Sequence, residues 1–240
     1  MELSKDEKYM ELAIAEANKA FEQGEFPVGC VIIFNDKIVA SGSRLGTTSS
    51  EKYPSEIYHA EIRALQSFEN SISDGITKHY NGTSNDDAIG VCSETGKISR
   101  SKRIPEKYDL ISRSKIMPEK CTLYCTMEPC LMCFGAIILS GIKKIVYSFE
   151  DPMGGGTSCD LKSLSPLYRD SGISVIPHVL RDKSLELFAR FFSKKDNLYW
   201  KNSFLEKYTL EEMIKAESLK KGHGTKKLSL PKGQMRLRKS

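Results

Sequence analysis

Apolar residues near the start of the chain recur every three or four positions, as they do on one face of an α-helix. They are Met10, Ala13, Ile14, Ala17 and Phe21. Ser4 and Glu7 fit the capping-box pattern, in which each side chain accepts a hydrogen bond from the other residue's backbone N–H. The pattern predicts a helix over residues 4–22 that stops at Gly24.

Short apolar runs and helical patterns then alternate along the chain. Residues 28–34 and 37–41 flank Asn35-Asp36, a pair that favours tight turns, so we expect a β-hairpin. The other expected strands are residues 120–126, 144–149 and 173–177, and the other expected helices are residues 59–68, 130–140, 182–192 and 203–219. Residues 130–140 are apolar on every side, which predicts a buried helix. Alternating strands and helices predict an α/β layered fold.

Residues 69–119 interrupt this alternation and are rich in Ser, Gly, Asn, Asp and Lys. A loop of this length is uncommon inside a compact domain, so we interpret it as a surface insertion. Its second half is basic, with eight basic and four acidic residues in 94–120. We therefore expect one domain over residues 1–195 that carries the insertion, followed by a C-terminal helix and a basic tail over residues 196–240.

The composition excludes several classes of protein. Of the 240 residues, 40% are hydrophobic and 28% are charged, which is typical of a globular protein and unlike collagen, a wholly disordered chain or a disulfide knot. No apolar run reaches the roughly 18 residues of a membrane-spanning helix, so we expect no membrane partner. The first ten residues lack the apolar core of a signal peptide, which predicts a cytoplasmic protein. The seven cysteines should then be reduced, and a cluster of them suggests metal binding or catalysis.

Positive charge is concentrated at the end of the chain. The net charge is +5, yet residues 219–240 alone hold eight Lys or Arg and no acidic residue, so the rest of the chain is net negative. We expect this tail to be disordered when free. It is either an arm that binds nucleic acid or a solubilising tail, and the sequence favours neither. The lysines considered as RNA contacts are Lys194, Lys195, Lys220, Lys221, Lys226 and Lys227.

Two short segments contain residue types that bind metals or transfer protons. The first is His59-Ala60-Glu61, and the second, residues 128–133, reads Glu-Pro-Cys-Leu-Met-Cys. Cys130 and Cys133 lie one helical turn apart, so both sulfurs can face one point at the positive end of the predicted helix. Thiolates and imidazoles are preferred ligands of Zn²⁺, and a catalytic zinc ion keeps three protein ligands and a water molecule. His59 would be the third ligand. Glu61 would then be free to carry a proton.

Each segment alone has a simpler interpretation. Cys-x-x-Cys pairs occur in redox proteins and in ordinary cores, and His-x-Glu occurs by chance in many chains. The presence of both segments, with Glu128-Pro129 directly before the first cysteine, favours a metal site. The expected cofactor is one zinc ion per chain.

Four stretches, residues 25–30, 126–133, 154–156 and 187–192, are similar to motifs of one enzyme group. On these motifs the chain resembles the cytidine deaminase superfamily of zinc enzymes and, within it, the tRNA-specific adenosine deaminases. The resemblance covers residues 5–65 and 120–195 and implies a three-layer α/β/α sandwich with a mixed five-stranded sheet. It also implies a homodimer whose active site is completed across the interface.

The resemblance implies hydrolytic deamination, in which zinc lowers the pKa of a water molecule and Glu61 moves protons from that water to the substrate. The groups implied in substrate binding are Val28, Gly29 and Pro129, with Arg44 added from its position in the chain. Arg44 lies where many base and nucleoside deaminases of this type carry an asparagine. It would either bind a phosphate or be an ordinary surface arginine, and we favour the second interpretation.

Three functions remain open. The leading hypothesis is deamination of adenosine to inosine in tRNA, which makes tRNA or another RNA the expected partner. The second is deamination of a free base, nucleoside or nucleotide of the cytosine or guanine type. The third is a non-catalytic RNA-binding subunit with a structural zinc ion, against which Glu61 argues. For Phe191, Phe192, Tyr199 and Trp200, we favour a core or dimer-contact role over stacking on bases.

Overall fold

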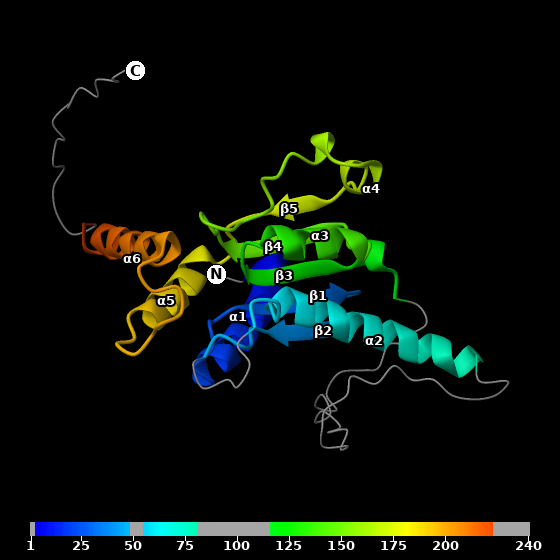
Figure 1. Cartoon of the computed structure of the whole chain (residues 1–240), viewed down its shortest axis with the longest axis horizontal. Helices are drawn as coiled ribbons and strands as arrows, with labels where there is room; N and C mark the ends of the chain where they lie inside the picture. Colours follow the sequence, from blue (N-terminus) through cyan, green and yellow to red (C-terminus); the bar gives the residue numbers. More distant parts are fainter. Residues whose placement is uncertain (1–2, 49–54, 81–115, 223–240) are drawn as a thin grey trace.

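In the computed structural model, residues 3–48, 55–80 and 116–222 are described, without the side chains of residues 71–80 and 220–222. They form one mixed five-stranded sheet with the strand order β2-β1-β3-β4-β5 (Figure 1). The strands are β1 (Gly29–Phe34), β2 (Lys37–Ser43), β3 (Thr122–Met127), β4 (Lys144–Phe149) and β5 (Ser174–Ile176). β1 is antiparallel to β2 and β3, whereas β3, β4 and β5 are parallel. The predicted α/β fold with a mixed five-stranded sheet is confirmed.

Helices cover both faces of the sheet. They are α1 (Lys5–Glu22), α2 (Ala60–Tyr80), α3 (Leu131–Leu139), α4 (Pro166–Arg169), α5 (Arg181–Phe192) and α6 (Phe204–Gly222), with short 3-10 turns at Pro118–Lys120 and Leu161–Ser163. α1 packs on Val31, Ile33 and Val146 on one face. α2 and α3 contribute to the core on the other face, which contains Ile32 and Leu123. α5 and α6 pack together at one end of the sheet (Figure 1).

The local signals near the start of the chain are confirmed. The Ser4 hydroxyl accepts a hydrogen bond from the Glu7 N–H, and the Glu7 carboxylate accepts one from the Ser4 N–H, which completes the capping box. Asn35 and Asp36 both have positive φ angles, 46° and 63°. Two successive positive φ angles are typical of a type I′ turn, whose twist matches that of the two strands it connects.

Two predicted helices differ from the observed ones. The helix expected over residues 59–68 continues to Tyr80, because no proline stops it, so the first part of the predicted insertion is helical. The helix expected over 130–140 is not buried on every side, since Leu131 and Leu139 are each 62% exposed. This helix, α3, is an outer layer and packs on the sheet only through the side that carries Phe134 and Ile137.

Several expectations concern residues outside this description. The rest of the predicted insertion, residues 81–115, and the end of the basic tail with Lys226 and Lys227 lie outside the described residues. For Lys220 and Lys221 only the helical backbone of α6 is described. Within the described residues, no helix combines the length and the apolar character that crossing a membrane requires.

Candidate metal centre and active site

The three predicted metal ligands meet at one point. His59 directly precedes α2, Cys130 is the N-cap residue of α3, and Cys133 lies in the first turn of α3. The His59 Nδ1 atom is 3.6 Å from the Cys130 sulfur and 3.4 Å from the Cys133 sulfur. Typical Zn–S and Zn–N bonds at tetrahedral angles put nitrogen and sulfur about 3.6 Å apart. The donor set and its spacing therefore fit a zinc ion with three protein ligands.

The topology of the sheet brings these ligands together. β3 ends at Met127, and α3 starts four residues later, so both cysteines lie at the carboxyl end of a central strand. α2 follows β2, and its start lies beside the same end of the sheet (Figure 1). Hydrogen bonds from Cys133 and from the His59 ring lower the pKa of the Cys130 thiol to about 4, although burial opposes this change. A low thiol pKa favours the thiolate form that binds metals.

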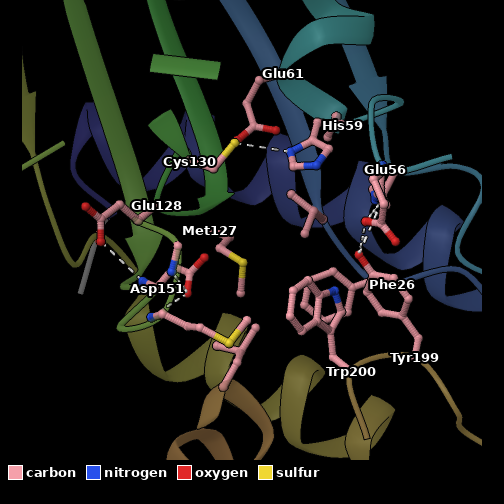
Figure 2. A pocket seen from close by; sticks show the side chains of 16 residues that line it. Phe26, Glu56, His59, Glu61, Met127, Glu128, Cys130, Asp151, Tyr199 and Trp200 are labelled. Atoms are coloured by element: carbon pink, nitrogen blue, oxygen red, sulfur yellow. Dashed lines mark hydrogen bonds and ion pairs between the residues drawn. The ribbon is translucent and has the colours of Figure 1, made fainter. Parts of the chain in front are cut away.

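Glu61 lies next to the ligands, in the first turn of α2, and is only 3% exposed. Burial raises the pKa of its carboxyl group to about 7, although the nearby His59 pulls the pKa down. A carboxyl group with a pKa near neutrality can both accept and release a proton at physiological pH. Figure 2 shows Glu61, His59 and Cys130 grouped at one end of a cavity.

This cavity has a volume of about 240 Å³. Its lining combines the predicted metal site with apolar, aromatic and acidic side chains from distant parts of the chain. The residues are Phe26, Val28, Arg44, Glu56, His59, Ala60, Glu61, Met127, Glu128, Cys130, Asp151, Met153, Gly154, Tyr199, Trp200 and Leu205. Pockets for drug-sized ligands are typically about 300 to 1,000 Å³, so this cavity has room for a single small heterocycle and not for a folded nucleic acid.

The structure separates the predicted substrate-binding residues into two groups. Val28 and Arg44 line the cavity, whereas Gly29 and Pro129 are absent from its lining. The Gly29 N–H donates to the Thr126 hydroxyl at 3.1 Å, and the missing side chain of Gly29 makes room for the backbone of α1. The Pro129 carbonyl accepts a hydrogen bond from the Gly156 N–H. Both residues therefore have structural roles next to the cavity.

Arg44 is 2% exposed, so the favoured interpretation as an ordinary surface arginine is wrong. Its Nη2 atom lies 3.2 Å from a carboxylate oxygen of Glu56 and 3.3 Å from the Tyr199 hydroxyl. The Nη1 atom is buried without a hydrogen-bond partner among the described residues. Glu56 precedes α2 and Tyr199 follows α5, so this guanidinium joins three separate parts of the chain at the cavity wall.

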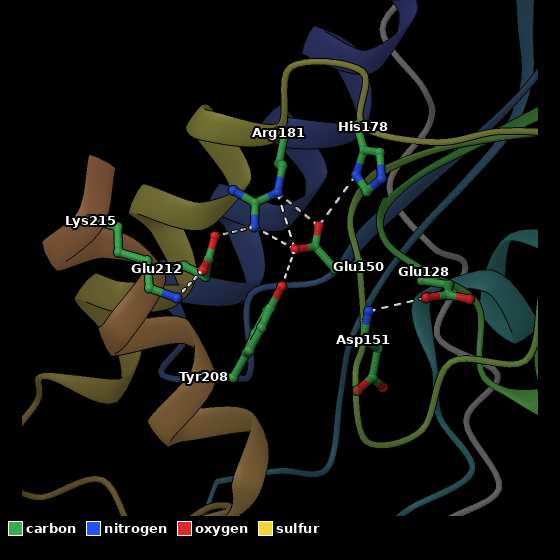
Figure 3. Close-up of polar contacts among 8 residues, drawn as sticks. All are labelled: Glu128, Glu150, Asp151, His178, Arg181, Tyr208, Glu212 and Lys215. Atoms are coloured by element: carbon green, nitrogen blue, oxygen red, sulfur yellow. Dashed lines mark hydrogen bonds and ion pairs between the residues drawn. The ribbon is translucent and has the colours of Figure 1, made fainter. Parts of the chain in front are cut away.

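A glycine-rich loop after β4 forms another side of the cavity. The Glu128 carboxylate accepts hydrogen bonds from the Asp151 N–H at 3.2 Å and from the Thr157 hydroxyl at 2.5 Å. Figure 3 shows the contact between Glu128 and Asp151. A side chain at Gly156 would meet the Leu131 nitrogen at 2.6 Å, so only glycine lets the loop lie against the start of α3. Glu128 was expected only as part of a motif, and the structure gives it this positioning role.

The C-terminal residues Tyr199, Trp200 and Leu205 also line the cavity, and no local motif in the sequence indicated this. α6, which follows Tyr199 and Trp200 and contains Leu205, is joined to the end of β4 by polar contacts (Figure 3). Tyr208 donates a hydrogen bond to Glu150 at 2.6 Å. Arg181, which also contacts Glu150, is 2.8 Å from Glu212 of α6.

The two described lysines that were considered as RNA contacts differ from each other. The Lys194 ammonium group lies 3.9 Å from the centre of the Phe21 ring, in the range of a cation–π contact. Lys195 is exposed. Lys195 is therefore open to a polyanion, whereas Lys194 already has an aromatic partner.

Comparisons with known proteins agree with this geometry. Residues 3–149 match the family described as "Cytidine and deoxycytidylate deaminase zinc-binding region". The tRNA-specific adenosine deaminase of Bacillus subtilis (strain 168) is 30% identical over 190 residues, which cover 79% of this chain and 90% of that protein. That of Aquifex aeolicus (strain VF5) is 27% identical over 191 residues, covering 80% and 96%. The cytosine deaminase of Candida albicans (strain SC5314 / ATCC MYA-2876) is 24% identical over 192 residues, covering 79% and 91%.

Proposed function

The chain belongs to the cytidine and deoxycytidylate deaminase zinc-binding family, and from this premise we propose that it deaminates adenosine to inosine in tRNA. The observation that carries the chemistry is the buried Glu61 beside His59, Cys130 and Cys133 at one end of a small cavity. A purely structural zinc site has no need of a buried carboxylate facing such a cavity. This arrangement therefore speaks against the non-catalytic RNA-binding alternative.

His59, Cys130 and Cys133 would hold the zinc ion, which would supply an activated water molecule at neutral pH by lowering the pKa of that water. Glu61 would take up the proton that the water loses and pass it to a ring nitrogen of the base, because its carboxyl pKa lies near 7. The hydroxyl group would bond to the ring carbon that carries the amino group, which would leave as ammonia. Phe26, Val28 and Met127 give the cavity apolar walls. These walls exclude bulk water and hold the base against the proton carrier.

The choice of tRNA as substrate has separate support. Several similar proteins, including those of Bacillus subtilis and Aquifex aeolicus, are tRNA-specific adenosine deaminases. The small cavity suits one base that has been turned out of its stack, as in the unpaired loops of RNA. The basic residues of the tail supply positive charge that attracts a polyanion.

A second candidate function is deamination of a free base, nucleoside or nucleotide. Two observations favour it: the similarity to a cytosine deaminase, and the aromatic residues Tyr199 and Trp200 that narrow the cavity. The two functions differ in salt dependence: binding through many RNA phosphates weakens steeply as salt rises, whereas a free base or nucleoside makes no phosphate contact and a nucleotide makes contacts through its own phosphate only.

A second copy of the chain is the other proposed partner. Residues next to the metal ligands in sequence are apolar and exposed, namely Ile57, Tyr58, Leu131 and Met132. Where such residues form one continuous patch, they are typical of a protein contact site, and this supports the proposal of a dimer. Light scattering of the purified protein should give the mass of a dimer, and a monomeric mass at micromolar concentration would contradict this proposal.

The central test is to incubate the zinc-loaded protein with a tRNA pool and, separately, with a panel of nucleosides and free bases. Inosine in tRNA, with no turnover of the small substrates, is the expected result. Turnover of small substrates with unchanged tRNA would replace the proposal with the second candidate. Absence of deamination in both mixtures would overturn both.

A Glu61→Ala variant tests the proton carrier. We expect its zinc content to match the unmodified protein and its turnover to fall by about 10² to 10⁴, the usual contribution of a general acid–base group. Elemental analysis and the inosine assay measure the two quantities. Glu69→Gln, an exposed change on the same helix, is the matched control and should keep full activity. Undiminished turnover in Glu61→Ala would refute the assigned role.

A further inference from the structure

The wall of the cavity away from the metal site is built by a segment beyond the family match. That match ends at residue 149, whereas Tyr199, Trp200 and Leu205 belong to residues 197–205, which we call the wall segment. Leu205 is buried in the core, and Tyr199 is half-buried. Trp200 remains 42% exposed although it lines the cavity. A large aromatic surface is therefore partly exposed in the cavity wall that lies away from Glu61 and the metal ligands (Figure 2).

The wall segment is held in place by contacts on several sides. The Tyr199 hydroxyl lies 3.2 Å from Glu56 and 3.3 Å from Arg44. The Tyr199 ring packs on Phe26, with 5.4 Å between ring centres. The ring of Trp200 then stands perpendicular to Tyr199, with its centre 5.9 Å away. Trp200 is thus attached to an anchored neighbour and does not belong to a free tail.

The backbone conformation at Trp200 also indicates that this residue is held in a fixed position. Its φ angle is 53°, in the left-handed region that bulky side chains rarely adopt. Such a conformation persists only where surrounding contacts enforce it, and it is often found at functional sites. The Asn197 side chain accepts a hydrogen bond from the Tyr199 N–H at 3.1 Å and fixes the turn just before Trp200.

We propose that Trp200 stacks on the nucleobase that the cavity receives, so that the wall segment is part of the substrate-binding site. This inference rests on the proposed function, because it takes the ligand to be a nucleobase. Figure 2 shows Trp200 with Phe26 and Tyr199 on the side of the cavity away from Cys130 and Glu61. An indole ring there offers a flat π-surface to a flat heterocycle, and such stacking tolerates any base. Of the two roles favoured for Trp200, the core role is wrong because the residue is 42% exposed, and the dimer-contact role stays a prediction.

Trp200 is the only tryptophan in the chain, so tryptophan emission reports on this side chain alone. The experiment uses the zinc-loaded full chain with Glu61→Ala, in which slow turnover leaves the probe intact while binding is measured. Adenosine, cytosine and an RNA stem-loop with an unpaired adenosine are titrated separately. Binding of each probe is measured independently by equilibrium dialysis. We expect emission to fall as the probe binds, with the same dissociation constant as dialysis gives.

Variants of the wall segment complete the test. Trp200→Ala should weaken binding by about 5- to 150-fold, the range for loss of one aromatic stacking partner. Trp200→Phe keeps an aromatic ring and should recover most of the affinity. Leu198→Ala is the matched control, because Leu198 is 70% exposed in the same segment and is absent from the cavity lining. It should leave affinity unchanged.

The outcomes distinguish this inference from the proposed function. Binding without a change in emission, or equal affinity in the alanine and phenylalanine variants, would overturn the stacking role alone. If no probe binds, the stacking role and the proposed function fail together. Quenching by adenosine or cytosine, with no deamination of tRNA by the active protein, would support the stacking role and remove only the tRNA substrate.

Discussion

The carboxylate of Glu150 is the meeting point of several side chains at the end of β4 (Figure 3). Arg181 contacts it at 2.8 Å, Tyr208 donates to it at 2.6 Å, and His178 lies 3.3 Å away. Burial raises the pKa of Glu150, but the hydrogen bonds from Arg181 and Tyr208 outweigh burial and bring the pKa to about 2. A single carboxylate thus links α5 and α6 to the sheet, next to the loop that carries Asp151.

The low pKa of Glu150 predicts a dependence of stability on acid. Because the folded pKa lies below the usual value of 4.5, the ionised group stabilises the fold above about pH 4.5. This contribution is lost as the pH falls toward about 2, where the folded protein also takes up the proton. In Glu150→Gln this carboxylate is absent. The slope of the free energy of unfolding against pH should therefore be smaller than in the unmodified protein between these two pH values, by the contribution of about one bound proton.

Urea unfolding at a series of pH values measures this slope. Glu186→Gln, an exposed change on α5, is the control and should follow the unmodified protein. An identical slope in the Glu150 and Glu186 variants would contradict the assigned role of Glu150.

At the scale of helices and strands, the close approach of α2 to the sheet determines where His59 and Glu61 lie. A side chain at Gly42 of β2 would collide with the Ala60 carbonyl oxygen and would meet the Ala64 nitrogen at 2.6 Å. Both atoms belong to the first turns of α2, the helix that carries Glu61 and directly follows His59. The absence of a side chain at Gly42 therefore fixes the distance between this helix and the sheet.

Gly42→Ala should push the start of α2 away from β2. Overpacking of this kind costs about 1 to 3 kcal/mol of folding stability, and here it should also lower zinc occupancy, since His59 moves with the helix. Chemical denaturation and zinc analysis test the two effects. Ser41→Ala, at the neighbouring half-buried position, is the control. If the Gly42→Ala protein is as stable as this control and binds as much zinc, the close contact at Gly42 does not fix the position of α2.

Over the whole molecule, the chain after α5 completes the fold. α6 packs on α5, and Leu205 and Thr209 are buried. Tyr199 and Trp200 lie between the two helices in sequence and line the cavity. Of the C-terminal segment expected over residues 196–240, the described part, 196–222, thus packs against the residues before it. The strongly basic part that follows, residues 223–240, lies outside the described residues.

Two truncations should separate these parts. A chain ending at residue 195 loses a wall of the cavity and the cover of α5, so we expect a lower melting temperature and loss of turnover with every substrate. A chain ending at residue 222 loses six Lys or Arg. It should keep its melting temperature and bind RNA with a shallower salt dependence, because fewer phosphates are neutralised.

Thermal melts and RNA binding at several salt concentrations measure these effects. Unchanged stability and turnover in the shorter chain would contradict a structural role for residues 196–222. An unchanged salt slope in the longer chain would identify the tail as inert.

The amino-acid sequence by itself determined the features that depend on neighbouring residues. The capping box of α1, the turn at Asn35-Asp36 and the five strands follow from local patterns whose physical causes act over a few residues. The candidate metal site was also predictable, because two of its residues are one helical turn apart and the third, His59, lies two residues before Glu61.

Only the tertiary structure decided which distant residues meet. Arg44 changes from an expected surface residue to a buried link between Glu56 and Tyr199, and Trp200 reaches the cavity from far along the chain. The exposure of one apolar side of α3 was likewise decided by the tertiary structure, because the sequence pattern does not reveal which side of this helix the sheet covers. Periodicity records the geometry of one element, whereas these contacts depend on how elements stack, which is fixed by packing across the whole chain.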